Sequence, residues 1–200
     1  MKTLLKELRI SVLATLAFAL ICCGAYPLLV WAGGQLLFPH QANGSLIAEK
    51  GRVVGSALVG QGFSGAAYFQ PRPSDAGNGY DGMNSGGSNL GPTSQKLVDT
   101  VRANAENYRR ENGLAPGVTL PADAVEASAS GLDPDISPAN ALLQAPRVAR
   151  ERHAGLDAVL ALVKAHTQGP TFGIFGDSRV NVLELNLDLD AKFPLEAPRG

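Results

Sequence analysis

The sequence predicts a mixed α and β (α/β, α+β type) globular domain attached to one N-terminal transmembrane helix. Three observations lead to this prediction. An uncharged run of 29 residues lies near the N-terminus, and a bilayer core needs about 20 apolar residues in a helix. Beyond it, segments with helical spacing occur beside apolar runs typical of strands. The chain of 200 residues is long enough for one such domain behind an anchor.

Composition excludes several classes of protein. The chain is 45% hydrophobic and 18% charged, whereas disordered chains are rich in charge and poor in apolar residues. Lys and Arg number 17 against 18 Asp and Glu, so no basic excess exists and no nucleic-acid partner is expected. The only cysteines, Cys22 and Cys23, are adjacent, which excludes a disulfide scaffold and a cysteine-based zinc site.

The uncharged run covers residues 10–38, and we place the core of the membrane span at about 12–31. A cleaved signal peptide is the alternative interpretation. Signal-peptide cores have about 7–15 apolar residues and end at a small-x-small site. This run is longer, and Leu20-Ile21-Cys22 lacks small residues at the required places. We therefore expect a retained single-pass anchor.

The charges that flank the run predict its orientation. Lys2, Lys6 and Arg9 precede it, opposed only by Glu7, while residues 40–49 contain no Lys or Arg. The positive-inside rule then places residues 1–9 in the cytoplasm of a bacterial cell. The domain, residues 40–190, is expected outside the inner membrane, in the periplasm, and residues 191–200 are expected to form a tail.

The domain shows helix and strand patterns in turn. A Val-rich run at 52–59 predicts a strand, and a glycine- and proline-rich loop follows over 60–93. Apolar spacing predicts a helix from about Ser94 to Asn112, closed by Gly113. Ser137-Pro138 predicts the start of a further helix, interrupted at Pro146 and resumed through Val163. Unbroken alternation over 183–190 predicts a strand.

Two glycine-rich motifs occur in the loop. Gly60-x-Gly62-x-x-Gly65 matches a dinucleotide fingerprint, but Pro71 and Pro73 leave no room for the helix that this motif needs. We interpret it as a turn. The second motif lies within residues 85–92. It could bind an anion with its backbone N–H groups, or it could form a structured turn before the Ser94 helix. Its candidate residues are Ser85, Gly86, Gly87, Ser88, Asn89 and Gly91.

The remaining polar groups show no catalytic arrangement. Asp133 and Asp135 could hold a metal or act as an acid–base pair, but we expect them to complement the positive end of the Ser137 helix. The charged cluster of Arg147, Arg150, Glu151 and Arg152 is read as a solvated face, with a docking surface as the minority alternative. Two classes stay open: an accessory subunit of a membrane complex, or a membrane-tethered enzyme or binding module.

Several short motifs occur in one order along nearly the whole chain. They are Tyr68-Phe69, Arg72-Pro-Ser74, Ser85-Gly-Gly-Ser-Asn-Leu-Gly-Pro92, Ser130-Gly-Leu-Asp-Pro134 with Ile136-Ser-Pro138, Gln144 with Arg147-Val-Ala149, and Arg179-Val-Asn-Val-Leu-x-Leu-Asn186. Together with the N-terminal span, the chain resembles the C subunit of the bacterial potassium-transporting Kdp ATPase. It departs from that family's pattern at Asp135, where a histidine is usual.

The resemblance implies a pump of four subunits. The partners would be a potassium channel-like subunit, a P-type ATPase subunit and a small single-helix subunit. The resemblance implies no catalytic site or bound cofactor in this chain, and the chain would be linked to ATP through the ATPase subunit. One family view makes the C chain a catalytic chaperone that raises ATP affinity, with Gln144, and with it Arg147, as candidate nucleotide or partner contacts. A competing view places the domain over the potassium entrance, outside the membrane.

We therefore predict a non-catalytic accessory subunit of a potassium uptake pump, needed for assembly and activity. The alternative is an extracytoplasmic, membrane-tethered binding module with an independent ligand near residues 60–93. The flanking charges favour the outside placement, and ATP is cytoplasmic. Any effect of the domain on ATP affinity would then be indirect.

Overall fold

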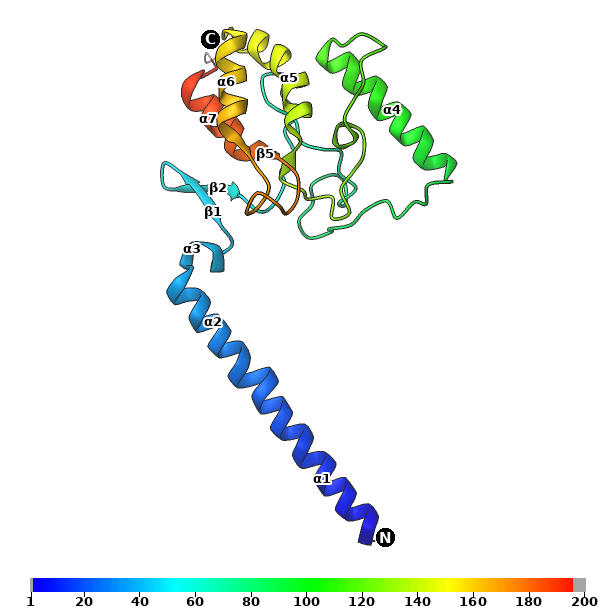
Figure 1. Cartoon of the computed structure of the whole chain (residues 1–200), viewed down its shortest axis with the longest axis vertical. Coiled ribbons are helices and arrows are strands. Elements are labelled where there is room, and N and C mark those ends of the chain that lie inside the picture. The colour runs from blue at the N-terminus through cyan, green and yellow to red at the C-terminus, as the bar shows by residue number, and fades with distance from the viewer. Residues whose placement is uncertain (1, 196–200) are drawn as a thin grey trace. The chain divides into compact units, whose positions relative to one another are not determined.

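The computed structural model describes residues 2–195 and contains two compact units, which meet between Leu46 and Ile47. In the first unit, α1 (Lys2–Phe18), the π-helix η1 (Ala19–Ala25) and α2 (Tyr26–Leu37) follow one another without a break. Residues Thr3–Leu37 have a mean hydropathy of 2.1 in their most apolar window, and none of that window is buried (Figure 1). This helix is long and apolar enough to cross a membrane, as the sequence predicts.

The second unit combines helices with two small antiparallel sheets, so the predicted mixture of α and β structure is confirmed. A hairpin pairs β1 (Leu46–Glu49) with β2 (Arg52–Ser56). The other sheet has the order β3-β5-β4, formed by Asp135–Ile136, Arg179–Asn181 and Thr167–Gln168. Its register pairs Ile136 and Thr167 with Val180 from opposite sides.

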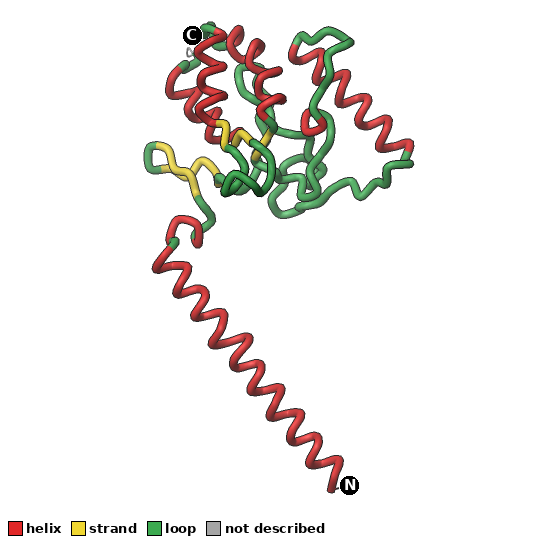
Figure 2. Tube along the Cα trace, in the orientation of Figure 1, coloured by secondary structure: helices red, strands yellow, loops and turns green. Residues whose placement is uncertain are grey.

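Five further helices complete the described chain. They are the short α3 (Pro39–Ala42) of the first unit and, in the second, α4 (Gln95–Asn112), α5 (Pro138–Glu151), α6 (Leu156–His166) and α7 (Val182–Lys192). A 3-10 turn, η2, covers Ala122–Ala124. Between β2 and α4 the chain runs as the expected long loop, drawn in green in Figure 2.

The main hydrophobic core lies where α5, α6 and α7 pack against the three-stranded sheet. Its fully enclosed side chains include Phe69 from the loop, Val148, Val159, Val180 and Leu185. A smaller cluster of Tyr108, Ala124 and Val125 lies under α4. The loop therefore contributes Phe69 directly to the main core.

The predicted helix ends are confirmed at two places. Ser94 is the N-cap residue of α4, and Gly113 closes it in the left-handed conformation with φ of 64°. Ser137 caps α5, since its hydroxyl accepts a hydrogen bond from the Asn140 N–H, and Pro138 follows in the first turn. β2 is shorter than the predicted strand and ends at Ser56.

The predicted strand over 183–190 is wrong, because these residues form α7. Five positions of α7 are buried: Val182, Leu183, Leu185, Asn186 and Leu189. Four of them, Val182, Leu185, Asn186 and Leu189, recur with the helical spacing of three, one and three. Because Asn186 is polar, the apolar residues alone show the alternation of the leucines, and this alternation predicts a strand rather than a helix. The helix is capped by Asn181, whose side-chain oxygen accepts from the Glu184 N–H.

The predicted interruption at Pro146 is also wrong, because α5 continues to Glu151. Pro146 lacks an N–H and leaves the carbonyl of Leu142 without its usual helical partner. Both residues are exposed, so water can reach that carbonyl. The opposite face of α5 packs extensively on α6, which stabilises the helix across the proline.

Candidate functional site

A segment of the loop, Ala66–Gln70, is held in place by side chains from the helices; it begins as a turn at Ala66 and Ala67, and Phe69 is its buried residue. We call it the central segment. The carbonyl oxygens of its five residues all accept hydrogen bonds from side chains. The donors are Arg147, Arg152, Gln144 and Asn186, which lie on α7 or on α5 and its C-cap. The backbone carbonyls of this partly buried segment need hydrogen-bond partners, and side chains provide them in place of the neighbouring strands of a sheet.

Two amide side chains hold successive residues of the central segment from opposite sides. The Asn186 amide accepts from the Phe69 N–H and donates to its carbonyl, both at 2.9 Å. Gln144 treats Gln70 in the same way, accepting from its N–H at 2.7 Å and donating to its carbonyl at 2.9 Å. Successive N–H and C=O pairs of an extended chain point in opposite directions, so one amide comes from α7 and the other from α5.

Arg147 is the largest fully enclosed side chain, at 2% exposure. Its guanidinium donates to Asn112 at 2.9 Å, to Gln144 at 2.8 Å and to the carbonyls of Ala66 and Tyr68. Burial lowers the pKa of Arg147 from its usual value. Its direct hydrogen-bond partners are oxygens of amide and carbonyl groups, so neutral dipoles compensate the buried charge and join α4, α5 and the central segment.

Arg152 forms a second buried contact at the end of α5. Its Nε donates to the Ala67 carbonyl at 2.8 Å, and one terminal nitrogen contacts Asp190 at 2.6 Å. The guanidinium also lies 4.6 Å from the centre of the Tyr68 ring. The predicted solvated face is therefore wrong for Arg147 and Arg152. Arg150 and Glu151 do form an exposed pair.

The next part of the loop docks on residues 130–134. Arg72 pairs with Asp133 at 2.8 Å, and the Ser74 hydroxyl donates to the Gly131 carbonyl at 2.6 Å. Gly131 has φ of 68°, and a Cβ there would lie 2.6 Å from the Ala76 nitrogen. These contacts join two of the sequence motifs, Arg72-Pro-Ser74 and Ser130 to Pro134.

The Ser85–Gly91 motif packs on this same turn. The Ser85 hydroxyl and the Gly86 N–H both donate to the Ser130 carbonyl, at 3.0 and 2.9 Å. A Cβ at Gly87 would lie 2.9 Å from the Ala129 carbonyl oxygen. Ser88 and Asn89 lead to Gly91, whose carbonyl accepts from the Ser94 N–H at the start of α4. In the structure the first part of this motif therefore lies against Ala129 and Ser130, and its last residue leads into the turn before α4. Its anion-binding alternative stays a prediction.

The acids Asp133 and Asp135 do not complement the N-terminus of α5, contrary to our expectation. Asp133 pairs with Arg72, and Asp135 lies 3.2 Å from Arg179. The acid at that helix end is Asp123, which accepts from the backbone N–H and the hydroxyl of Ser137 at 2.7 and 2.8 Å. Fourteen residues separate Asp123 from Ser137, so local sequence gives no signal of this contact.

Asp135 occupies a partly buried position beside another acid. Burial, followed by the nearby charge of Asp133, raises the pKa of Asp135, while Arg179 acts in the opposite direction. A cavity of about 520 Å³ lies beside these three residues and Asp123. Within residues 2–195, no three His, Cys, Asp or Glu side chains are grouped so that they could hold a metal ion.

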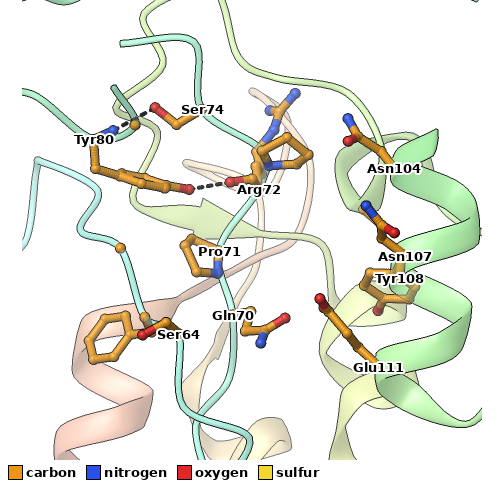
Figure 3. A pocket seen from close by; sticks show the side chains of 15 residues that line it. Ser64, Gln70, Pro71, Arg72, Ser74, Tyr80, Asn104, Asn107, Tyr108 and Glu111 are labelled. Carbon is orange, nitrogen blue, oxygen red and sulfur yellow. Dashed lines mark hydrogen bonds between the residues drawn. The ribbon is translucent and has the colours of Figure 1, made fainter. Parts of the chain in front are cut away.

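A cleft of about 420 Å³ lies between the loop and α4. Figure 3 shows Gln70 and Arg72 on one side and Asn104, Asn107 and Glu111 of α4 on the other. Gln144 holds the backbone of Gln70, which is the residue of the central segment that lines the cleft. The amides, backbone groups and one carboxylate of this cleft suit the binding of a polar group.

Two tyrosines line the cleft. Tyr80 donates to the Arg72 carbonyl, and the Tyr108 hydroxyl donates to the Asn140 side chain at 2.7 Å. Burial raises the pKa of both phenols, so they stay protonated at neutral pH. They act as hydrogen-bond donors that order the cleft rather than as bases.

Asn140 extends the buried network across the domain. Its side chain accepts from Gln144 at 2.9 Å and donates to Asp123, also at 2.9 Å. One set of hydrogen bonds therefore runs from Asp123 through Asn140 and Gln144 to the central segment, and through Arg147 to Asn112 on α4. Sequence reasoning singled out Gln144 and Arg147 but missed their partners Asn140 and Asn112, and it missed Asn186, which holds Phe69.

The architecture is that of a chain with one long apolar N-terminal helix and one mixed helix-and-sheet domain, organised around a buried side-chain network. Comparison with known proteins assigns it to a family. The family model for the K+-transporting ATPase c chain, KdpC, matches residues 8–191. The chain belongs to this KdpC family.

Individual relatives agree over nearly their full length. The chain is 54% identical over 192 residues to the potassium-transporting ATPase KdpC subunit of Myxococcus xanthus, covering 96% of this chain and 89% of the relative. It is 49% identical over 194 residues to the KdpC subunit of Koribacter versatilis (strain Ellin345), covering 97% of this chain and 99% of the relative. The corresponding subunit of Rhodospirillum rubrum (strain ATCC 11170 / ATH 1.1.1 / DSM 467 / LMG 4362 / NCIMB 8255 / S1) is 52% identical over 193 residues, covering 96% and 99%.

Proposed function

We propose that this chain is a non-catalytic accessory subunit of an ATP-driven potassium pump, and that its domain supports assembly and activity of the partner subunits. The observation that carries the proposal is the full-length match to the K+-transporting ATPase c chain. The expected partners are the P-type ATPase subunit, the channel-like subunit and the small single-helix subunit. The polar cleft beside the central segment is the surface we assign to partner recognition.

Gln144 and Arg147 act in this proposal as positioning residues. Their side chains are 0% and 2% exposed in the structure, and both the oxygen and the nitrogen of the Gln144 side-chain amide already have partners. A nucleotide that bound Gln144 directly would have to displace Gln70 or Arg147, which would leave buried polar groups unpaired at a cost of about 1–3 kcal/mol each. A direct contact is therefore the weaker form of the family prediction.

The effect on ATP affinity is accordingly proposed to be indirect. Three basic residues precede the apolar helix and none lies in residues 40–49, which supports a periplasmic domain. A domain on that side can change ATP affinity only through the membrane part of the complex. Coupling of this kind is typically worth about 1–3 kcal/mol.

Reconstitution of the four-subunit pump tests the proposal. We expect potassium-stimulated ATP hydrolysis to require this chain and to be absent from the chain alone. In pumps with Gln144→Ala, the fraction of assembled complex should fall, while the KM for ATP of the assembled fraction stays unchanged. Gln95→Ala, which alters an exposed glutamine on α4, is the matched control. A raised KM in a fully assembled, normally stable pump would support direct nucleotide contact instead.

The cleft also keeps the binding-module alternative open to experiment. It is lined partly by Gly62, Ser64 and Tyr80 from the loop where an independent ligand was expected. Glu111→Gln removes the carboxylate of α4 that faces the cleft without changing its size (Figure 3). Loss of assembly in this variant favours partner recognition, whereas normal assembly with loss of a co-purified small molecule favours the alternative.

A further inference from the structure

The loop between β4 and β5 exposes three large apolar side chains. Phe172, Ile174 and Phe175 are 89%, 78% and 66% exposed. A soluble surface seldom carries three such residues within four positions, and contiguous apolar patches usually mark sites of interaction. We call this segment, Thr171–Phe175, the apolar tip.

The backbone of the apolar tip is fixed by its own hydrogen bonds. Thr171 and Phe175 exchange a pair of them, at 2.8 and 3.0 Å, and Gly173 donates to the Pro170 carbonyl at 2.9 Å. Phe172 has φ of 55°, a left-handed conformation that is costly for a bulky residue. The tip is therefore an ordered turn that holds its apolar side chains outward.

The apolar tip lies at the same end of the domain as the hairpin of β1 and β2, where Figure 1 shows it in the orange loop before β5. A hydrogen bond of 2.9 Å from Asn181, on β5, to the carbonyl of Ala57 ties these parts together. This end also exposes Val53 and Leu58.

The length of the connection limits how far this end can move from a membrane. Phe38–Leu46 separates α2 from the rest of β1, and these nine residues could span at most about 30 Å if fully extended. Part of the connection is the short helix α3, which shortens it further. A domain tethered so closely meets the lipid surface at a high effective concentration.

We propose that the apolar tip inserts into the lipid interface, so that the domain rests on the bilayer. Residues 165–178 contain no Lys or Arg and one acid, Asp177, so attraction to anionic headgroups does not contribute. The occupant suited to this surface is the boundary between headgroups and acyl chains of a neutral phospholipid, where Phe and Leu side chains commonly bury. The inference is independent of the pump partners and of which leaflet faces the domain.

The test uses the full chain in phosphatidylcholine nanodiscs, without partner subunits. A fluorophore sensitive to polarity is attached to Phe172→Cys in a Cys22→Ser, Cys23→Ser background, and nitroxide groups on the lipid acyl chains act as quenchers. Met83→Cys, at a side chain that is 94% exposed in another loop, is the matched control.

The probe at position 172 should be quenched at least about two-fold more than the probe at position 83, since interfacial side chains enter to about 5–10 Å. Quenching should persist at about 1 M salt, where charge attraction is screened. A reporter at Ile174→Cys should lose this quenching when Phe172→Ser and Phe175→Ser are added. Equal, weak quenching at positions 172 and 83 would overturn the proposal. So would protection of the tip that appears only after the pump subunits are added, because the occupant would then be protein.

Discussion

The side-chain amide of Gln144 accepts a hydrogen bond from the N–H of Gln70 at 2.7 Å and donates one to the Gln70 carbonyl at 2.9 Å. The contact joins α5 to a loop residue 74 positions earlier in the chain. Asn186 repeats the arrangement on Phe69 from α7. The order of the central segment, including Gln70 where it lines the cleft, therefore depends on a few buried polar side chains rather than on a strand partner.

The first prediction concerns this contact. Gln144→Ala leaves the N–H and carbonyl of the half-buried Gln70, and one donor of the buried Arg147, without their side-chain partner, so we expect a loss of about 2–4 kcal/mol in the free energy of unfolding. Denaturant titration of the detergent-solubilised chain, followed by circular dichroism, measures it. Gln95→Ala should change stability by less than about 0.5 kcal/mol, as expected for an exposed site. Equal effects of the two changes would contradict the role given to Gln144.

The second prediction concerns the buried arginine. Arg147→Lys keeps the charge, but an ammonium group cannot reach Asn112, Gln144 and two carbonyls with the planar geometry of a guanidinium. We expect a loss of about 2–4 kcal/mol, as for other buried charges that lose partners. The matched change Arg150→Lys, at an exposed position, should be nearly neutral. Limited proteolysis should also cut Arg147→Lys within residues 57–94 more rapidly than the wild-type chain.

The third prediction follows from the raised pKa of Asp135. A carboxyl with a folded pKa above its unfolded value binds protons more strongly in the folded state, so its contribution to stability falls as pH rises. The window begins at the unfolded value of about 3.9 and ends at the raised folded pKa. Asp135→Asn removes this term. The stability of the variant relative to wild type should therefore rise with pH across the window, by no more than about 1 kcal/mol for this partly exposed group.

Chemical denaturation at several pH values between about 4 and 7 measures this difference. Titration of the carboxyl groups that do not interact with Asp135 affects both proteins equally and cancels in the comparison, so the difference reports Asp135 together with its neighbour Asp133. A difference that stays constant with pH, or that falls as pH rises, would show that Arg179 rather than burial controls the Asp135 carboxyl.

The fourth prediction concerns the turn that receives two sequence motifs. Gly131→Ala places a Cβ 2.6 Å from the Ala76 nitrogen and 2.8 Å from the Gly86 carbonyl oxygen, at a φ of 68°. We expect a loss of at least about 1–3 kcal/mol from backbone strain. Gly117→Ala, where a Cβ meets no atom within 4 Å, is the control. Thermal unfolding that is equally unaffected in both variants would contradict the close packing described here.

Sequence predicted those parts of the fold that depend on local patterns. The apolar helix, α4 and the start of α5 are specified by residues within a few positions, such as Ser94, Gly113 and Ser137. α7 was misread because Asn186 occupies a buried helix position as a polar residue. Its buried side chain becomes understandable only when Phe69, 117 residues earlier, is beside it.

The candidate site was predictable only in part for the same reason. Gln144 and Arg147 could be selected by resemblance, but their contacts with Gln70, Tyr68 and Asn112 are long-range and leave no periodic signal. The buried state of Arg147 and Arg152 was likewise hidden, since charged residues on a helix are usually solvated. Such positions depend on tertiary structure rather than on local propensity.

We propose above that the domain acts from outside the cytoplasm, so that any influence on ATP is indirect. The most direct test is the labelling of Met83→Cys, in a Cys22→Ser, Cys23→Ser background, by a thiol reagent that cannot cross the inner membrane of intact cells. Met83 is 94% exposed, so access depends on the side of the membrane rather than on burial. Thr3→Cys, on the predicted cytoplasmic side, is the control. With the domain outside the cytoplasm, we expect position 83 to be labelled before lysis and position 3 only after the inner membrane is opened. Protection of position 83 until the inner membrane is opened, followed by efficient labelling, would contradict the periplasmic placement and favour direct contact with ATP.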